Sequence, residues 1–479
     1  MSGRRGDDLG AGLAPADEVV ERALERAGGA GAVVLVEDSS DAEVRFANNT
    51  TTTNGTRRDR RVTVISLAPV AGGTAVGVAR RGGDVDLAEV VAAAEADAAS
   101  SPPADDGWPL VTPGDRAAAG RAGQDPDFAD PPVLTGLGVL HDVVAGLAGA
   151  FARAEAADRV LAGFAEHHLS TLYLGTSAGL RLRHVQPTGA LHLVGRSTDG
   201  ARSAWAGTGA PDFAGVAVED LERRVVRGLD WARRRVDLDA GRYEVVIPPE
   251  AVADLMVGVV EAASGKESEE GRTVFSGPDG STRLGAELSR LPFELRSDPG
   301  EAGLECTPFL ATPVSGPDDS VFDNGLALAR TDWIEAGRLH RLRYHRAGAA
   351  AAGAPAAPPI DNLVLDLPGA QGSVEDLVAR TERGLLLTCL WYIREVDPQT
   401  LLLTGLTRDG VYLVEGGEIT GAVNNFRWNE SPVDLLGRAT EAGASVRALG
   451  REFGEWYNRT AMPPLRVPDF NMSSVSPAS

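Results

Sequence analysis

The chain of 479 residues is poor in cysteine and lysine. Its two cysteines, Cys306 and Cys389, are too few for a disulfide framework and are typical of a reducing compartment. Lys266 is its one lysine, so nearly all of the positive charge is arginine. The sequence lacks the uninterrupted apolar run of about 18 residues that spans a membrane, and residues 1–30 lack the apolar centre of a secretory signal. We therefore expect a cytoplasmic protein that does not cross a membrane.

Positively charged residues are also fewer than negatively charged ones. The 46 Lys and Arg residues face 68 Asp and Glu residues, which gives a net charge of −22 and a pI near 4.8. Such a chain repels phosphate backbones and anionic lipids, so neither nucleic acid nor a membrane surface is an expected partner. Hydrophobic residues make up 43% of the chain, which is ordinary for a folded protein with a large core.

Catalytic motifs are largely absent. The sequence contains no phosphate-binding G-x-x-x-x-G-K-[ST] loop, no G-x-S-x-G nucleophile motif and no S-x-x-K motif. A zinc peptidase helix needs two histidines one turn apart beside a glutamate, yet none of the seven histidines here is followed by Glu. Most of these histidines are therefore interpreted as structural or surface residues, and the two cysteines as plain buried ones.

Helical and strand patterns are mixed along the chain without a regular strand–helix–strand repeat, which predicts the α+β class. We expect two domains. Residues 1–238 form a mixed N-terminal domain of helix, hairpin, helix and meander, with a Pro-rich loop at 101–133. Residues 239–479 form a strand-rich C-terminal domain.

Local patterns predict several turns and helices. Asn54-Gly55 is typical of a tight hairpin turn. Residues 169–195 read as a three-stranded meander with turns at 176–179 and at 187–189. In the C-terminal half, Ser373 begins a capping box before a short helix, Gly416-Gly417 marks a hairpin turn, and a helix is expected over 433–449.

Several segments of the C-terminal half resemble the TldD/PmbA family of peptidase subunits. These segments are YEVVIPPEAV at 243–252, DNG at 323–325, GLLLT at 384–388, WYIR at 391–394, LTGLTRDG at 403–410, VEGGEI at 414–419, NNFRWNESP at 424–432 and PDFNMSSV at 468–475. The N-terminal half agrees with the family in its organisation. The resemblance extends over about residues 15–475 and is strongest after residue 240.

The resemblance separates two kinds of subunit by a metal site. TldD-type subunits carry H-E-x-x-x-H on the helix that follows the strand at 243–247, plus a late cysteine, and bind zinc. This chain has Pro249 and Asp254 at the two histidine positions, and Glu250 alone fits the pattern. Proline has no donor atom for a metal, and Asp254 with Glu250 would make a pair of hard oxygen ligands that does not suit a zinc peptidase. We therefore expect neither a catalytic residue nor a bound metal in this chain.

The chain thus resembles the TldE/PmbA-type subunit. The resemblance implies a non-catalytic or regulatory subunit, inactive alone, of a heteromeric cytosolic protease. Its TldD-type H-E-x-x-x-H partner would hold the zinc, and the complex would trim or degrade unfolded or extended peptides. Strand-rich domains can hold such peptides through main-chain hydrogen bonds.

Two alternatives stay open. The chain could be a self-associating peptide-binding or scaffold protein without proteolytic activity, or an enzyme with an unrecognised site that uses Glu250, Asp254 or His184. For peptide contacts we select Trp391, Tyr392, Arg394 and Arg408, because aromatic and Arg side chains are enriched at interfaces. The competing interpretation is that Trp391 and Tyr392 pack in the core.

Overall fold

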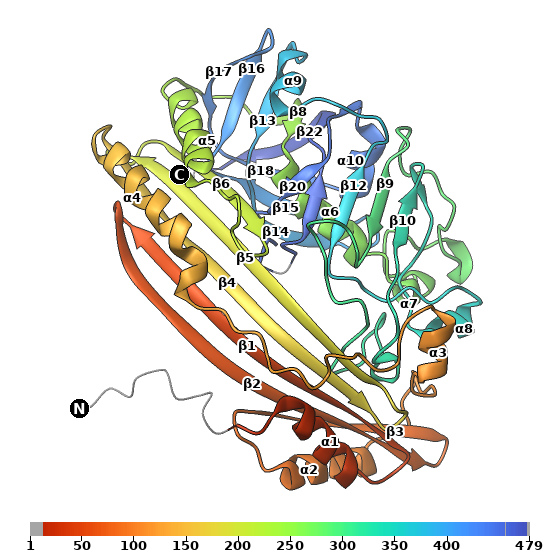
Figure 1. Cartoon of the computed structure of the whole chain (residues 1–479). Coiled ribbons are helices and arrows are strands. Elements are labelled where there is room, and N and C mark those ends of the chain that lie inside the picture. Colours follow the sequence, from red (N-terminus) through yellow and green to blue (C-terminus); the bar gives the residue numbers. More distant parts are fainter. Residues whose placement is uncertain (1–12, 456, 477–479) are drawn as a thin grey trace.

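The structure is a computed structural model that describes residues 13–455 and 457–476. This part of the chain contains three β-sheets with helices on their faces and between them (Figure 1). Helices and mostly antiparallel strands are mixed without a regular repeat, which confirms the α+β class.

The N-terminal sheet is built from long antiparallel strands in the order β3-β2-β1-β4-β5-β6. The register between β1 and β4 runs without a break from Val33 opposite Thr176 to Phe46 opposite Gly163. In Figure 1 these strands cross the molecule diagonally, beside the C-terminal half. The strands are β1 (Gly31–Ala47), β2 (Thr50–Val70), β3 (Gly73–Gly82), β4 (Arg159–Thr176), β5 (Arg181–Ser197) and β6 (Ser203–Ala210).

Helices cover one face of this sheet. Because side chains alternate along a strand, Val34, Val36, Val44 and Phe46 of β1 all point to the same face, where they pack against the helices. The N-terminal helices are α1 (Ala16–Arg26), α2 (Leu87–Ser100), α3 (Pro113–Ala118), the 3₁₀ turn η1 (Leu137–Leu140), α4 (His141–Glu155) and α5 (Val218–Trp231).

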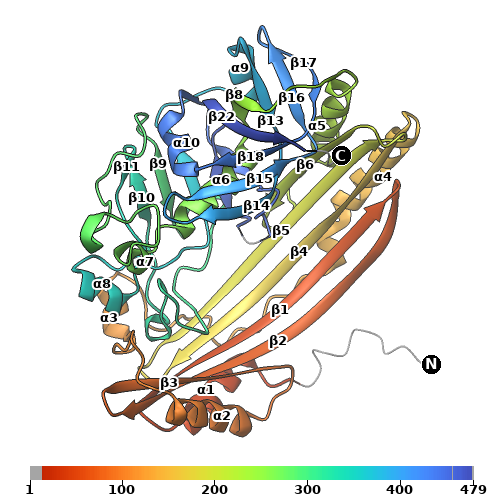
Figure 2. The same ribbon diagram turned by 180° about the vertical axis from the view of Figure 1, so that it is seen from behind.

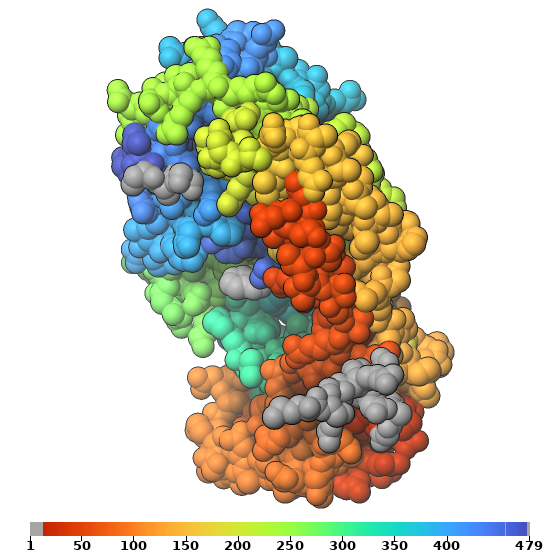
Figure 3. All heavy atoms as spheres, turned by 90° about the vertical axis from the view of Figure 1, so that its left-hand side faces the viewer, coloured from red at the N-terminus to blue at the C-terminus, as the bar shows by residue number. Residues whose placement is uncertain are grey.

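The opposite face of β1 changes character along its length. Val33 and Leu35 pack in an apolar cluster with Phe309 and Phe322 from the C-terminal half. Farther along the strand, residues 37, 39, 41 and 43 on the same face are polar and only half-buried. A recess separates the outer strands from the C-terminal half in the side view (Figure 3).

Two sheets make up the C-terminal half. The smaller has the order β11-β10-β9-β12-β21-β20, and the larger has the order β14-β15-β18-β22-β8-β13-β16-β17-β7, with β19 paired to β22. The smaller sheet consists of β9 (Glu294–Ser297), β10 (Thr331–Glu335), β11 (Arg338–Leu339), β12 (Leu363–Asp366), β20 (Val446–Ala448) and β21 (Thr460–Met462). The larger consists of β7 (Arg235–Val236), β8 (Gly241–Ile247), β13 (Arg383–Leu387), β14 (Leu390–Asp397), β15 (Leu402–Thr407), β16 (Val411–Glu415), β17 (Glu418–Val423), β18 (Phe426–Glu430), β19 (Glu441–Ala442) and β22 (Leu465–Val475).

Helix α6 (Pro249–Glu261) lies in the core of this half (Figure 2). Pro249 at its first turn costs no hydrogen bond, because that N–H would have no helical partner. The helix is apolar nearly all round, as a helix buried among sheets should be, and it packs in one core cluster with strands of both sheets. The remaining helices are α7 (Gly265–Glu269), η2 (Pro278–Gly280), η3 (Val321–Asp323), α8 (Arg346–Ala352), α9 (Val374–Ala379) and α10 (Pro432–Arg438).

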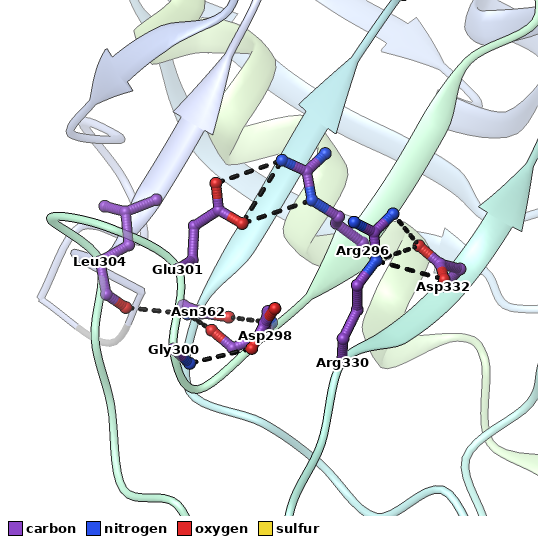
Figure 4. Close-up of polar contacts among 8 residues, drawn as sticks. All are labelled: Arg296, Asp298, Gly300, Glu301, Leu304, Arg330, Asp332 and Asn362. Carbon is purple, nitrogen blue, oxygen red and sulfur yellow. Dashed lines mark hydrogen bonds and ion pairs between the residues drawn. The ribbon is translucent and has the colours of Figure 1, made fainter.

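A polar network fixes the loop that follows β9 (Figure 4). The amide of buried Asn362 donates to the carbonyls of Asp298 and Leu304 at 2.6 and 2.8 Å and accepts from the Asp298 N–H at 2.9 Å. The same loop reaches the N-terminal sheet, where Gln186 donates to the Glu305 carbonyl at 3.2 Å. The network therefore helps to hold the two halves together.

Two turn predictions were wrong. In both places a strand continues through the predicted turn, at a point where one of its neighbouring strands has ended or has not yet begun. The β1–β2 turn lies at Asn48-Asn49, both with positive φ, while Asn54-Gly55 continues β2 beyond the end of β3. The meander has two strands rather than three, and Pro187 lies inside β5 before β6 begins to pair at Gly189. A proline without an N–H is tolerated where no neighbour needs that donor.

Two helix expectations also need correction. The Pro-rich segment 101–133 contains the short helix α3, which Thr112 and Asp115 cap reciprocally. The helix expected over 433–449 ends at Arg438, and the chain then forms β19 and β20. The capping box at Ser373 and the turn at Gly416-Gly417 are confirmed.

One helical segment among the described residues, Leu137–Glu155, is long and apolar enough by length and composition to cross a membrane. Its apolar run is interrupted by His141, Asp142 and Arg153, so the segment lacks an unbroken apolar stretch of about 18 residues. Its buried residues Val143 and Leu147 pack in the cluster that joins α4 to the N-terminal sheet. The core helix of a soluble protein passes the same test.

Candidate functional site

A cavity of about 830 Å³ opens at the start of α6, between α5 of the N-terminal half and α9 of the C-terminal half. Pro249 and Glu250 lie in its wall. Two ion pairs bridge the halves here: Arg224 binds the Glu250 carboxylate, and Arg227 lies 2.7 Å from Glu375. The first turn of α6 is thus tied to α5 by the one residue of the H-E-x-x-x-H pattern that this chain retains.

Asp254, at the second histidine position, is fully buried and faces a loop of the C-terminal half. Its carboxylate accepts hydrogen bonds from three consecutive backbone N–H groups, those of Arg451, Glu452 and Phe453, at 2.8 to 3.2 Å. Gly450 precedes them, and a Cβ there would lie 2.4 Å from Asp254 Oδ1, so glycine permits the close approach. Burial raises the pKa of Asp254 to about 7, although the three N–H donors act in the opposite direction.

These residues do not fit a zinc ion. Zinc requires donor atoms with free lone pairs from His, Cys or carboxylate side chains. Pro249 has none, Arg224 occupies the Glu250 carboxylate, and the loop N–H groups occupy both oxygens of Asp254. No group of three or more His, Cys, Asp or Glu in the described part of the chain could hold a metal ion.

Cys389 lies closer to this region than its place in the sequence suggests. It is fully buried, and Asp254, Asp409 and Arg451 are near enough to act on its thiol electrostatically. Burial raises the pKa of that thiol far above its ordinary range. The thiol therefore stays protonated at neutral pH and is a poor metal ligand or nucleophile.

Arg451 joins the two halves beside Asp254. Its guanidinium lies 5.0 Å from the ring centroids of both Trp205 and Trp391, and 3.6 Å from Asp409. Ser203 Oγ donates to the Asp409 carboxylate at 2.6 Å. We call Arg451, Trp205, Trp391 and Asp409 the Arg451 clamp. Because Ser203 and Trp205 belong to β6, the clamp fixes the N-terminal sheet against the loop that Asp254 holds.

His192 packs against the clamp from β5. Its ring stacks on Phe164 at 4.6 Å and lies 5.9 Å from the Trp205 ring. Burial, with a smaller contribution from Arg451, lowers the pKa of His192 to about 4. The ring is therefore neutral at physiological pH. The sequence analysis missed His192, Trp205 and Arg451, since no motif or spacing connects them.

The four residues selected for peptide contacts lie on one hairpin, β14–β15, and its continuation. Trp391 is half-buried inside the clamp, which fits the core interpretation for that residue. Tyr392 is 55% exposed, and the Arg394 guanidinium lies 5.8 Å from its ring centroid. Arg408 lies beside Asp409, at 3.7 Å. Tyr392 and Arg394 thus form an accessible pair, and Trp391 serves packing.

His184 lies apart from these residues on β5. Its Nε2 is 3.0 Å from Gln186 Oε1, and its ring meets the edge of Phe309. Burial lowers the pKa of His184. Within the described residues, no hydrogen bond, ion pair or ring contact joins His184 to Glu250 or Asp254, so the three groups do not form a common catalytic arrangement.

Structural comparison finds the same fold in ten solved chains, among them the following three. TldE from Thermococcus kodakarensis superposes with a TM-score of 0.74 at 18% identity, covering 97% of this chain and 100% of that one. A proposed modulator of DNA gyrase from Thermotoga maritima MSB8 gives 0.72 at 15% identity, with 95% and 98% covered. A protein described in the same way from Bacteroides thetaiotaomicron VPI-5482 gives 0.73 at 14% identity, with 96% and 98% covered.

Sequence comparison adds a family. A search of curated proteins gave no match. The family described as the PmbA/TldA metallopeptidase C-terminal domain matches residues 240–474, which include β8, α6, the clamp residues Trp391, Asp409 and Arg451, and most of β22. With this match over the C-terminal half and a shared fold over nearly the whole length, the chain belongs to the TldD/PmbA family.

Proposed function

We propose that this chain is the non-catalytic, TldE/PmbA-type subunit of a heteromeric zinc peptidase, and that a TldD-type subunit with an intact H-E-x-x-x-H helix holds the metal. One observation carries the proposal: at the positions where TldD-type subunits have the H-E-x-x-x-H motif, α6 of this chain has no set of zinc ligands. Asp254 binds the 451–453 loop in place of a metal, so this part of the fold is complete without one.

The proposed substrates are unfolded or extended peptides, which the complex trims or degrades in the cytoplasm. The recess beside the N-terminal sheet supports this class of substrate, because its polar, half-buried strand face can hydrogen-bond to an extended chain. The two free, buried cysteines fit a reducing compartment.

The test measures zinc content and peptide cleavage for the full chain alone and after co-expression with an H-E-x-x-x-H paralogue. We expect co-purification of the two chains, with zinc and cleavage in the complex and neither in the lone chain. Replacing the glutamate of the partner's motif by glutamine should abolish cleavage, because that residue serves the metal-bound water.

Glu250→Gln in this chain is the matched change at the equivalent position. It should leave cleavage by the complex unchanged, since Glu250 is paired with Arg224 and has no metal to serve. Zinc-dependent cleavage by the lone chain would refute the subunit assignment. Peptide binding without any paralogue in the purified material would favour the scaffold alternative.

A further inference from the structure

Strand β14 lies at the end of the ten-stranded sheet, and β15 is its only strand partner in the described part of the chain. The N–H of Tyr392 donates to Glu452 at 3.2 Å, which covers the start of the outer edge. Beyond it, residues 394–396 are exposed, and Val396 is 55% exposed. An open strand edge presents backbone N–H and C=O groups to which an extended segment can add.

A groove of about 620 Å³ lies between the β14–β15 hairpin and α6, and we call it the β14 groove. Ile393 and Glu395 of β14 line one side of it. Most of its lining is apolar, and the other lining residues include Val257, Gly258, Leu401, Leu403, Phe453 and Tyr457. Because side chains alternate along a strand, a segment added to β14 would direct every second side chain into this groove.

Carboxylates outnumber cations in the β14 groove. Glu261, Glu267 and Glu395 line it, and Arg272 is the one cation among the lining residues. Arg272 is already engaged by Glu267 at 3.4 Å. Arg343 engages Glu261 at 3.4 Å, which leaves Glu395 as the lining carboxylate without an ion pair in the described part of the chain. Burial, with Asp397 and Glu267 nearby, raises the pKa of Glu395, so a basic partner would relieve this unfavourable environment.

We propose that the β14 groove binds an extended segment that adds to β14 as a further strand and turns apolar side chains and one basic side chain toward the groove. The apolar side chains would enter the groove, and the basic one would meet Glu395, which lines the groove on the same side as Ile393. A second copy of this chain suits the groove poorly, since each copy carries a net charge of −22. The proposal rests on the proposed function and deepens it, because it adds a second place, besides the recess, where this subunit would hold an extended peptide, and names the kind of peptide this place prefers.

The test uses the intact chain and fluorescence anisotropy with two labelled, acetylated heptapeptides that have Thr at the even positions and Val at the odd positions. The residue at position 3, on the Val face, is Lys in one (the Val/Lys peptide) and Glu in the other (the Val/Glu peptide). We expect the Val/Lys peptide to bind at least about tenfold more tightly, a difference of about 1.4 kcal/mol. Added salt should weaken it. Glu395→Lys should weaken the Val/Lys peptide by a similar factor. The matched control Glu335→Lys, at an exposed glutamate of β10, should leave binding unchanged.

Strand addition has its own test. The Val/Lys peptide is N-methylated at its odd residues in one version and at its even residues in another, which blocks one hydrogen-bonding edge at a time. One version should lose binding and the other should keep it. Equal binding of the Val/Lys and Val/Glu peptides, no effect of Glu395→Lys, or no effect of either methylation pattern would overturn the proposal. The lone chain is used throughout, so these outcomes are independent of zinc content and co-purification with a paralogue.

Discussion

The N-terminal sheet and the ten-stranded C-terminal sheet are assembled in opposite ways. In the first, most neighbouring strands are also neighbours in the sequence, and all pairings are antiparallel. In the second, β8 lies between β22 and β13, and the β8–β13 and β17–β7 pairs are parallel. Short hairpins therefore set most registers in the N-terminal sheet, whereas β7 and β8 in the other sheet pair with partners roughly 140 to 230 residues away.

This difference bears on where function sits. The N-terminal sheet supplies a long, regular surface, while the irregular half supplies the cavity at α6, the loop held by Asp254 and the β14 groove. If the two regions are stabilised independently, a substitution in one of them should destabilise that region and leave the other unchanged.

The largest effect is expected at the buried ion pair of the N-terminal sheet. Arg60 donates two hydrogen bonds of 2.6 Å to Asp38, and both side chains are almost fully buried. Asp38→Ala would leave the Arg60 charge unpaired and should lower the free energy of unfolding by about 3–5 kcal/mol. On the same strands, Glu37→Ala removes a half-exposed pair with Arg61 and should cost less than about 1 kcal/mol. Denaturant titration of both variants measures this contrast, and similar losses would contradict it.

Matched Leu→Ala changes compare the two cores directly. Leu193 of β5 and Leu465 of β22 are both fully buried. Each change should cost about 2–5 kcal/mol through lost burial and a residual cavity. Hydrogen exchange should show loosening in the N-terminal sheet for Leu193→Ala, and around β8 and β18 for Leu465→Ala. Equal loosening of all three sheets in both variants would mean that the chain opens as a single unit.

Asp254→Asn tests the loop anchor within the C-terminal half. The amide keeps the shape but replaces one accepting oxygen by an NH₂ donor that faces the loop N–H groups. We therefore expect a loss of about 1–3 kcal/mol from unmade hydrogen bonds, and faster exchange at residues 451–453. The pKa of Asp254 is raised to about 7 in the folded chain. Its contribution to the free energy of unfolding therefore falls as the pH rises from about 4 to about 7. The variant should lack that fall, and an unchanged pH dependence would contradict the burial argument.

A smaller pH-dependent effect than that of Asp254 is expected at His192, on the N-terminal side of the clamp, because its pKa moves over a narrower pH interval. Its pKa is lowered from 6.5 to about 4 because the folded state resists charging the ring. The contribution of His192 therefore rises with pH over that interval, by at most about 1.4 kcal/mol per unit. His192→Gln should remove this rise, which is opposite in sign to the slope at Asp254. Thermal unfolding of the wild type and the variant between pH 4.5 and 7 gives the difference.

Capping and turn residues in the sequence predicted helix starts and turns correctly where no contact with a distant part of the chain decided the position. Ser373 caps α9 through Asp376, and Gly416 and Gly417 take the positive φ angles of their turn. Asn54-Gly55 failed because the chain already turns at Asn48-Asn49, where the Asn49 side chain donates to the Arg159 carbonyl and accepts from the Leu161 N–H of β4. Pairing of this kind depends on distant partners, which a window of sequence does not contain.

At this site, the sequence allowed only one prediction, that the zinc-binding motif is not present on α6. Pro249 and Asp254 excluded a zinc helix from the sequence, but the groups that bind Asp254 are backbone N–H groups, which leave no side-chain signal. The Arg451 clamp brings together Trp205 and Trp391 from different halves of the chain, so neither the composition nor the spacing of residues in the sequence predicts it.

The position of β22 has a consequence for biosynthesis. Its partner β8 is made roughly 220 residues earlier and lies beside it in the middle of the ten-stranded sheet. The ribosome adds about 5–20 residues per second, so β8 stays without its partner β22 for roughly 10–45 s. Strand β18 must also wait for β22. The N-terminal sheet is complete once residue 210 has been made and can fold while translation continues. A ribosome that stalls in the last few dozen codons would therefore release a chain with one finished half and one that exposes its central strands, which is a form that chaperones and proteases recognise.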